Sequence, residues 1–580
     1  MADDRRRAAV RLVVYSLITF LILLLCYMAF TGFSAYRALA SARTDLATAQ
    51  DMLGTAPAQS QEALQSAEVS AASAARTLTN PVWSAISAIP YLGSTPKAAG
   101  VVATSLDQTL VALQPAIGSL DILKPASLVQ SGTIDITAIE QAVPAAEQAL
   151  PGIERAQQTL DGAPTTGLLM GQVRDAGTQL DEQLTSLHAT LNTAVTFGKV
   201  AGPLLGQDGQ KRYFLGLLNP NEARGTGGFL GTYAILTANQ GAITIDQIGS
   251  NSDIPGLPAL PASIGEEFRN RYGDDPTLIG NMNMSPNFDD TARIWLAAWK
   301  QKTGEDLDGA MALDVVSLGQ LVSASGQPVT LPNGTQMNGA QLSRFVLRDI
   351  YKQFPDAAVR KEYQEAVTQS ALNTVTALSK PLPMAQALGQ ALTERRIVIW
   401  SRDKAVEKDL REAGVSGSLQ VPDGHQILPI VINSSGSKLD AWLNRGVVYD
   451  VGRCVQDGRV SSAVTVDLRS DVPLGERPPG YMIGQAQMGP NGPVHILTLQ
   501  VHLPNGALVT GAQLNGEEVG SFGFTEQGRP AVAVGVELPP RFTERVTISF
   551  TEPASDGPAV VGEQPLATPQ AVSVRDVECS

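Results

Sequence analysis

The stretch KRYFLGLLNPNEARGTGGFLGTYAIL, residues 211–236, decides how the middle of this chain folds. Two apolar runs, residues 213–218 and 229–236, flank a polar, glycine-rich segment. Short apolar runs with aromatic and branched residues, bounded by Gly and Asn, are typical of buried strands. The stretch therefore predicts a strand, a loop over residues 219–228 and a second strand.

Segments on the carboxyl side of this stretch alternate in type. Residues 292–304 favour a helix, residues 307–326 a strand that passes into a helix, residues 339–378 a helical stretch and residues 395–400 a late strand. Strands that alternate with helices are typical of an α/β layer domain. We expect this central α/β domain to span residues 201–430.

The last part of the chain, residues 431–580, has a different pattern. Apolar and polar residues alternate with period two in several runs, such as residues 464–469, 497–503 and 532–538. Runs of this kind, separated by turn signals such as Pro504-Asn505-Gly506, predict a C-terminal antiparallel β-sandwich.

Toward the amino terminus, residues 34–200 are rich in Ala, Ser, Thr and Gln and carry leucines at helical spacing. Narrow apolar stripes predict helices. An interior proline removes a helical hydrogen bond, so we expect several helices, not one rod, because prolines interrupt the pattern at Pro115, Pro125, Pro144, Pro151 and Pro164. The better-supported interpretation is a helical stalk or bundle that works as a spacer, and the whole chain is then an α+β multidomain protein.

An uncharged run, LVVYSLITFLILLLCYMAFTGFSAY, covers residues 12–36. A membrane-spanning helix needs about 20 mostly apolar residues, so we expect a transmembrane helix over residues 12–33. Four arginines precede it, at Arg5, Arg6, Arg7 and Arg11. The positive-inside rule places residues 1–11 in the cytoplasm and the bulk of the chain outside the cell membrane. The alternative is a cleaved signal peptide, whose apolar core would be shorter, roughly 7–15 residues.

Charge and cysteine content restrict the function further. The net charge of −14 argues against nucleic-acid binding, which requires a basic surface. Cys26 lies in the predicted span, whereas Cys454 and Cys579 lie on its oxidising side. A disulfide between Cys454 and Cys579 is the economical pairing, and two unpaired thiols are the alternative. The sequence shows neither zinc-ligand spacing nor a serine-hydrolase elbow with a plausible triad.

The segment NPNEARGTGGF, residues 219–229, carries the sharpest candidate site. Its glycine-rich backbone could cradle an anion, and Arg224 could add a forked donor to a phosphate or carboxylate. The alternative is a strand connection that needs glycine for positive φ, with Glu222 and Arg224 paired to each other. The candidate ligand-binding residues are Asn219, Asn221, Glu222, Arg224, Gly227, Gly228, Asp253 and Asn283.

A second group of polar residues lies between residues 253 and 293. Oxygen ligands such as those of Asp253 and Asn283 could hold Mg²⁺, a hard cation. Helix capping is the alternative, and it accounts for Asp289 and Asp290 better than for Asp253 and Asn283.

These stretches also carry a family resemblance. At residues 219–228, 281–299, 307–334 and 431–443 the chain resembles a bacterial family known as domain-of-unknown-function family 4012. Residues 81–98 are similar to the family's usual membrane-side region. The resemblance implies a membrane-anchored cell-envelope protein of bacteria and no established activity.

The order of elements in the central domain is similar to that of the LytR-CpsA-Psr phosphotransferases, which join pyrophosphoryl-lipid-linked glycopolymers to the cell wall. This resemblance implies a Mg²⁺ ion held by Asp253 and Glu222 and a pyrophosphate neutralised by Arg224. The chain departs from the pattern after Arg224, because Gly225, Thr226 and Gly227 stand where those enzymes have an Asp. Either Glu222 replaces that carboxylate, or catalysis is lost and binding alone remains.

Three functions remain open on this basis. The first is binding of an anionic envelope ligand, such as a lipid-linked glycan or a cell-wall polymer. The second is Mg²⁺-dependent transfer of a glycopolymer to the cell wall. The third is a purely structural role in the envelope.

Overall fold

The computed structural model describes residues 26–49, 52, 57–117, 129–130, 132–164, 166–167, 170–420 and 423–579. The chain divides into two compact units. The helical unit comprises Met1–Gln130 and Asp135–Ala201, and the globular unit comprises Ser131–Ile134 and Gly202–Ser580. Most of the predicted membrane span, residues 12–25, lies outside the described residues. Among those described, no helix is long and apolar enough to cross a membrane.

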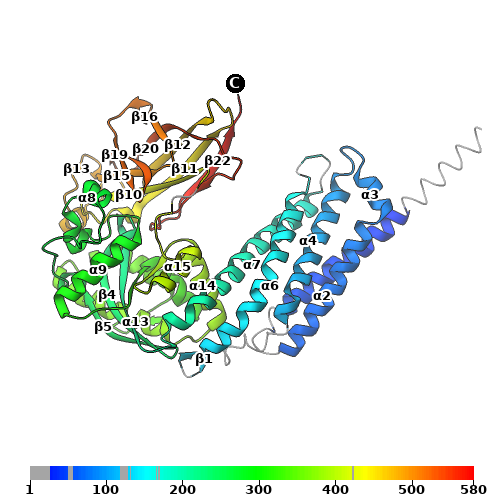
Figure 1. Ribbon diagram of the computed structural model, residues 1–580, viewed down its shortest axis with the longest axis horizontal. Helices are drawn as coiled ribbons and strands as arrows, with labels where there is room; N and C mark the ends of the chain where they lie inside the picture. The colour runs from blue at the N-terminus through cyan, green and yellow to red at the C-terminus, as the bar shows by residue number, and fades with distance from the viewer. Residues whose placement is uncertain are drawn as a thin grey trace, which may run out of the picture. The chain divides into compact units, whose positions relative to one another are not determined.

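The helical unit is a bundle of long helices (Figure 1). Many of the side chains buried between these helices are alanines. Its first helix covers residues 26–49. The others are α2 (Pro57–Leu78), α3 (Pro81–Ser87), α4 (Ser94–Ile117), α6 (Ile136–Asp161) and α7 (Gly171–Leu204). At Gly152 a Cβ would lie 2.3 Å from the Cβ of Ala112, so α4 and α6 approach through their smallest residues. The predicted N-terminal helical region is confirmed.

Three of the predicted interrupting prolines lie inside helices, contrary to the prediction: Pro115 lies near the end of α4, and two others lie within α6. Pro144 and Pro151 lie inside α6, which is continuous. A proline costs its own helical hydrogen bond, but most helical stability in proteins comes from packing of one face. Ala149 and Ile153 on α6 are fully buried, and this packing outweighs the local cost.

A mixed sheet forms the centre of the globular unit. Its strands run in the order β2 (Thr133–Ile134), β5 (Ala242–Ser250), β4 (Gly227–Asn239), β3 (Lys211–Arg224), β6 (Gly309–Asp314) and β9 (Ile397–Ser401). The pair β3–β6 is parallel, whereas β3–β4, β4–β5 and β6–β9 are antiparallel. The predicted central α/β architecture is therefore confirmed.

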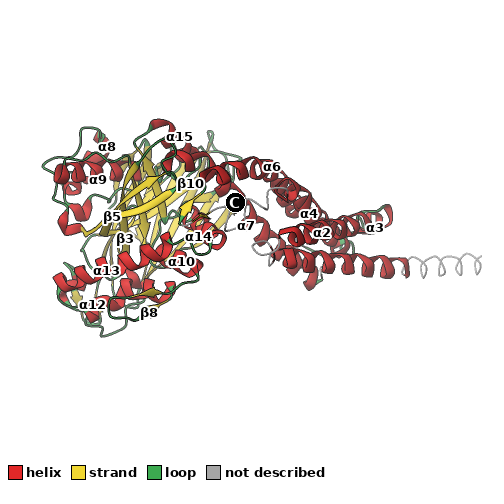
Figure 2. Ribbon diagram, turned by 90° about the horizontal axis from the view of Figure 1, so that it is seen from below, coloured by secondary structure: helices red, strands yellow, loops and turns green. Residues whose placement is uncertain are grey.

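Helices cover both faces of this sheet (Figure 2). On one face, α9 (Phe288–Thr303) packs Trp295 and Trp299 against Phe214 of β3. On the other face lie α10 (Val315–Ser325), α11 (Gly339–Arg344) and α13 (Ala357–Thr376). The remaining helical segments are η1 (Asn251–Asp253), α8 (Glu266–Tyr272), η2 (Asp275–Thr277), η3 (Ile279–Asn281), η4 (Phe345–Asp349), α12 (Ile350–Gln353), α14 (Pro381–Thr393) and α15 (Lys404–Glu412). The hairpin β7 (Val329–Thr330) and β8 (Gln336–Met337) completes this part.

The C-terminal part consists of two larger sheets around one core. One runs in the order β18 (Phe522–Glu526), β19 (Arg529–Leu538), β15 (His495–His502), β10 (Gln426–Asn433) and β21 (Val560–Val561). The other runs in the order β17 (Glu517–Glu518), β16 (Leu508–Leu514), β20 (Thr543–Pro553), β12 (Arg459–Ser470), β11 (Leu443–Gly452) and β22 (Ala571–Val577). Val431, Leu499, Val464 and Ile548 from both sheets belong to the same buried core. Short elements beside them are η5 (Asp440–Trp442), α16 (Gly480–Ile483), β13 (Met488–Gly489) and β14 (Gly492–Pro493).

The sequence predicts a fully antiparallel sandwich, but two strand pairs in this part are parallel. The edge strands β21 and β22 pair in parallel with β10 and β11. The chain after β20 returns along the outside of both sheets, and the direction of that return sets the parallel pairing. A disulfide joins Cys454, just after β11, to Cys579, just after β22, with a Cα–Cα distance of 5.2 Å.

Candidate functional site

The polar segment after residue 218 continues strand β3 and is not an open loop. Asn219 pairs with Phe229 and Ala223 pairs with Gly228 across the β3–β4 ladder, with a bulge between the two pairs. A bulge re-aims the side chains of the strand that carries it. Both asparagines, Glu222 and Arg224 are buried here, so the predicted loop lies inside the molecule.

The glycines that follow are required by close backbone packing. A Cβ on Gly225 would lie 2.1 Å from the carbonyl oxygen of Met284, and one on Gly228 would lie 2.4 Å from the carbonyl carbon of Asn219. Gly227 has φ of +120°, which side-chain-bearing residues rarely adopt. This agrees with the strand-connection alternative drawn from the sequence.

Glu222 lies at the centre of a buried charged cluster, the Glu222 cluster, which consists of Glu222, Arg224 and Lys438. Its Oε1 atom accepts a hydrogen bond of 2.5 Å from Nη2 of Arg224, and its Oε2 atom contacts Nζ of Lys438. The three side chains are 3–6% exposed. The carboxylate is therefore held between two cations of the same chain.

Backbone carbonyls accept hydrogen bonds from most of the other N–H groups of Arg224. Nε donates to Gly280, and Nη1 donates to Ala223 and Asn433, at 3.1–3.2 Å. Together with the bond to Glu222, these contacts use four of the five guanidinium N–H groups. Burial lowers the pKa of Arg224 to about 10, and this arrangement leaves few donors for a bound anion.

Lys438 is the member of the Glu222 cluster whose charged form burial disfavours most. Burial lowers the pKa of its ammonium group to about 7, while the nearby Asp440 acts in the opposite direction. The ammonium also lies 4.2 Å from the centre of the Phe229 ring, at the start of β4, a favourable cation–π position. Lys438 thus ties the segment after β10 to the β3–β4 connection.

Asp440 extends this connection into the C-terminal core. One of its oxygens accepts hydrogen bonds of 2.8 Å from the backbone N–H of Ala223 and from Nδ2 of Asn433. Its other oxygen lies 3.2 Å from Nδ1 of His495, whose Nε2 lies 3.2 Å from the hydroxyl of Ser470. An acid, an imidazole and a hydroxyl in this order also occur in catalytic triads. For hydrolysis, a substrate would have to reach the serine hydroxyl. Asp440, His495 and Ser470 are at most 1% exposed, so their arrangement is structural.

The asparagines of the segment bind backbone groups. The side-chain amides of Asn219 and Asn221 donate to the carbonyls of Val346 and Leu347 in η4, a π-helical segment. Asn283 donates to the hydroxyl of Thr226 and to the carbonyl of Gly228. The side-chain oxygens of Asn221 and Asn283 are buried without a hydrogen-bond donor. These two amide oxygens could therefore accept a hydrogen bond from a donor such as water, but they could not bind an anion.

Asp253 is placed apart from the Glu222 cluster. It is exposed at the end of β5, and its carboxylate accepts a hydrogen bond of 3.0 Å from the backbone N–H of Ser250 in a capping box. Within the described part of the chain, no group of three or more His, Cys, Asp or Glu side chains could hold a metal ion. Glu222 is paired with Arg224 and Lys438, and Asp253 with the backbone of Ser250, so a Mg²⁺ ion shared by these two carboxylates stays a prediction.

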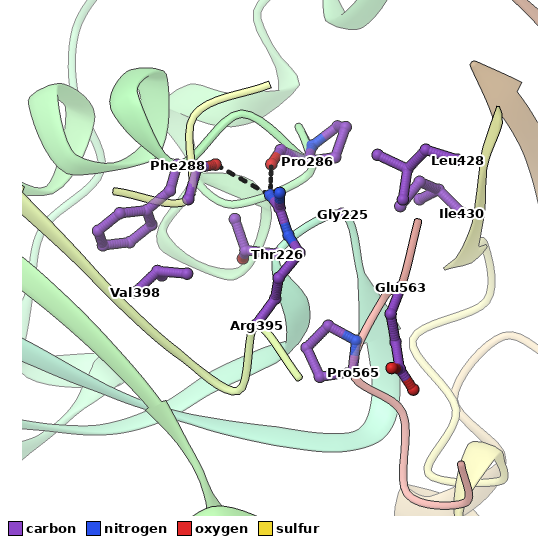
Figure 3. Close-up of a pocket in the computed structure, with 11 residues that line it drawn as sticks. Gly225, Thr226, Pro286, Phe288, Arg395, Val398, Leu428, Ile430, Glu563 and Pro565 are labelled. Carbon is purple, nitrogen blue, oxygen red and sulfur yellow. Dashed lines mark hydrogen bonds between the residues drawn. The ribbon is translucent and has the colours of Figure 1, made fainter. Parts of the chain in front are cut away.

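A small pocket adjoins Gly225 and Thr226 (Figure 3). Arg395 lines it and donates to the carbonyls of Gly417 and Pro286 at 3.0 and 3.4 Å. Figure 3 shows the Glu563 carboxylate turned away from this guanidinium. The space suits a water-sized group, and it is too small for a glycan.

The sequence interpretation missed Lys438, Asp440 and His495, which complete this buried network. Lys438 and Asp440 lie in VINSSGSKLDAWL, one of the stretches that carry the family resemblance. Only that resemblance could have indicated them, because more than 200 residues separate them from Glu222.

Comparison with known proteins gives one family match. The profile of the family described as "Protein of unknown function (DUF4012)" matches residues 208–351, which contain the β3–β4 connection and η4. No curated protein matches the chain. The matching solved structures include an M1 zinc metallopeptidase mutant from Deinococcus radiodurans bound to substrate (17% identity, TM-score 0.12) and a two-domain M1 zinc metallopeptidase mutant bound to L-arginine (16% identity, TM-score 0.12). Each match covers 20% of this chain and 22% of the other, and at these TM-scores neither bears on fold or function.

Proposed function

We propose that the protein is a single-pass, membrane-anchored scaffold of the cell envelope. Residues 12–33 span the cell membrane, residues 1–11 lie in the cytoplasm and the rest of the chain is extracytoplasmic. The uncharged run and the arginines before it support this topology. The disulfide between Cys454 and Cys579 supports it independently, because disulfides persist in oxidising compartments.

The observation that carries the scaffold role is the internal neutralisation of the Glu222 cluster. The two charged side chains of the candidate site, Glu222 and Arg224, form an ion pair with each other, and Glu222 also pairs with Lys438. Together with Asp440, they join the central sheet to the C-terminal sheets. The cluster therefore fixes how two parts of the globular unit meet.

Binding of a lipid-linked glycan at residues 219–228 and Mg²⁺-dependent phosphotransfer stay predictions. Both require the Arg224 guanidinium to leave Glu222 and face a ligand. A Mg²⁺ ion shared by Glu222 and Asp253 would also require both carboxylates to leave their present partners, Lys438 and the Ser250 backbone.

Cysteine labelling in cells tests the topology. Leu508 is 61% exposed on β16, so Leu508→Cys should react with a membrane-impermeant maleimide in intact spheroplasts. Asp3→Cys, in a background with Cys26→Ser, should react only after lysis. Labelling of position 3 in intact cells, or protection of position 508 until lysis, would contradict the proposed topology.

A further inference from the structure

The end of the helical unit at which the chain enters carries an uncharged apolar tip. The tip consists of the α3–α4 connection, residues 88–93, and Met170 before α7. Ile89, Tyr91, Leu92 and Met170 are 45–69% exposed there. Residues 80–96 and 162–173 contain no Asp, Glu, Lys or Arg. Exposed apolar side chains grouped in this way mark an interaction surface.

The two parts of the tip are in contact. The backbone N–H of Met170 donates a hydrogen bond of 3.0 Å to the hydroxyl of Thr95 at the start of α4. A Cβ on Gly167 would lie 3.2 Å from the carbonyl oxygen of Tyr91. Segments about 75 residues apart in the sequence therefore form one surface.

The backbone holds the apolar side chains outward. The N–H of Leu92 donates to the carbonyl of Pro90 at 2.8 Å, and the N–H of Gly93 donates to that of Ile89 at 2.9 Å. Tyr91, at the centre of the first turn, has φ of +69°. A γ-turn with positive φ is rare and strained, and for a bulky residue such strain persists where the surroundings impose it.

The start of α3, the helix that leads into the tip, contacts residues at the end of the predicted membrane span. Nε1 of Trp83 donates to the hydroxyl of Thr31 at 3.0 Å, and Nδ2 of Asn80 donates to the hydroxyl of Tyr27 at 3.2 Å. Figure 1 shows α3 at the same end of the helical unit as the start of the helix 26–49. Thr31 is two residues before the end of the span, which is about 3 Å along a helix. Trp83 then lies close to the level of the lipid headgroups, where Trp is enriched.

We propose that this tip inserts into the headgroup region of the bilayer that holds residues 12–33. The proposal rests on the membrane anchoring given as the proposed function. The occupant is a lipid bilayer because the apolar run of the chain contacts α3, the helix that leads directly into the tip. The helical unit then stands on the membrane at two points, and its tilt is fixed.

Depth-dependent quenching tests the insertion on the full chain reconstituted in phosphatidylcholine–phosphatidylglycerol vesicles. In a Cys26→Ser background, Leu92→Cys carries an environment-sensitive fluorophore. Val111→Cys, at a position that is 49% exposed on α4, serves as the matched control. It lies about 25 Å further along α4.

The proposal predicts that spin-labelled headgroups quench the label at position 92 at least threefold more than the label at position 111. Equal quenching, with equal access of aqueous iodide, would overturn it. Carbonate extraction of the same vesicles separates the two proposals. If the protein stays with the vesicles after extraction but position 92 is not quenched, only the tip insertion is refuted. If position 92 is quenched but carbonate removes the protein, only the membrane anchor is refuted.

A second variant checks that the label itself does not cause insertion. Tyr91→Ser should reduce the quenching of a label at Met170→Cys by at least half, because Tyr91 belongs to the same surface. Unchanged quenching at position 170 would contradict a joint apolar tip.

Discussion

Replacing Glu222 by Gln tests whether the Glu222 cluster is structural. The carboxylate faces Nη2 of Arg224 at 2.5 Å and contacts the ammonium of Lys438, and all three side chains are buried. Glu222→Gln keeps the shape of the side chain but leaves the Arg224 guanidinium and the Lys438 amino group without their anion. We expect a large loss in the free energy of unfolding of the globular unit.

The size of the loss follows from opposing terms. At a separation of about 4 Å and an effective dielectric constant of about 20, each ion pair is worth roughly 4 kcal/mol. Removing the carboxylate also removes its own desolvation cost of several kcal/mol. Breaking a buried pair by loss of one partner typically costs about 3–5 kcal/mol, and that is the expected result for Glu222→Gln.

Urea unfolding followed by tryptophan fluorescence measures this loss, because Trp295, Trp299, Trp400 and Trp442 all lie in the globular unit. Glu476→Gln is the matched control, since Glu476 pairs with Lys352 at 2.9 Å on the surface. An exposed pair contributes less than about 1 kcal/mol. A loss for Glu222→Gln no larger than that of the control would refute the structural reasoning.

Three further results are expected. Gly225→Ala should destabilise the globular unit strongly, because the new Cβ would lie 2.1 Å from the Met284 carbonyl oxygen, whereas Gly231→Ala meets its nearest atom at 3.9 Å; equal melting temperatures of the two variants would contradict this. Burial raises the pKa of Glu526 to about 7, so the folded state holds this proton more tightly than the unfolded state does. The free energy of unfolding should then fall by about 3 kcal/mol as the pH rises from about 4.5 to about 7, and urea unfolding at both pH values should show Glu526→Gln without this slope. Reduction of the Cys454–Cys579 disulfide should lower the free energy of unfolding by about 2–4 kcal/mol, and limited proteolysis should then cut β22 first; an unchanged cleavage pattern would argue against its tethering role.

The sequence predicted the type of each large region because hydrophobic period is a local property. Leucines at helical spacing and period-two strands reflect which face is buried. The sequence did not show that β3 continues to Arg224, because polar residues at a strand end resemble a loop. Asn219, Glu222 and Arg224 are satisfied by partners more than 50 residues away, such as Tyr351, Lys438 and Gly280.

Two other features depend on long-range contacts as well. Pro144 and Pro151 stay inside α6 through packing that the local pattern does not contain. The parallel edge strand β22 is exposed along its whole length, so its residues carry no burial signal for pairing direction. Lys438 and Asp440 belong to the buried network because the segment after β10 packs against the end of β3.

We propose above all that residues 219–228 act as a structural connection, and ligand binding at this segment stays the competing prediction. The direct test is to incubate the full-length protein in nanodiscs with Mg²⁺ and a polyprenyl-pyrophosphate lipid, beside the variant Arg224→Lys, and to follow lipid binding and phosphate-bond cleavage. We expect neither saturable binding nor cleavage by the wild-type protein. Binding or cleavage by the wild type that is lost in a folded Arg224→Lys variant would contradict it.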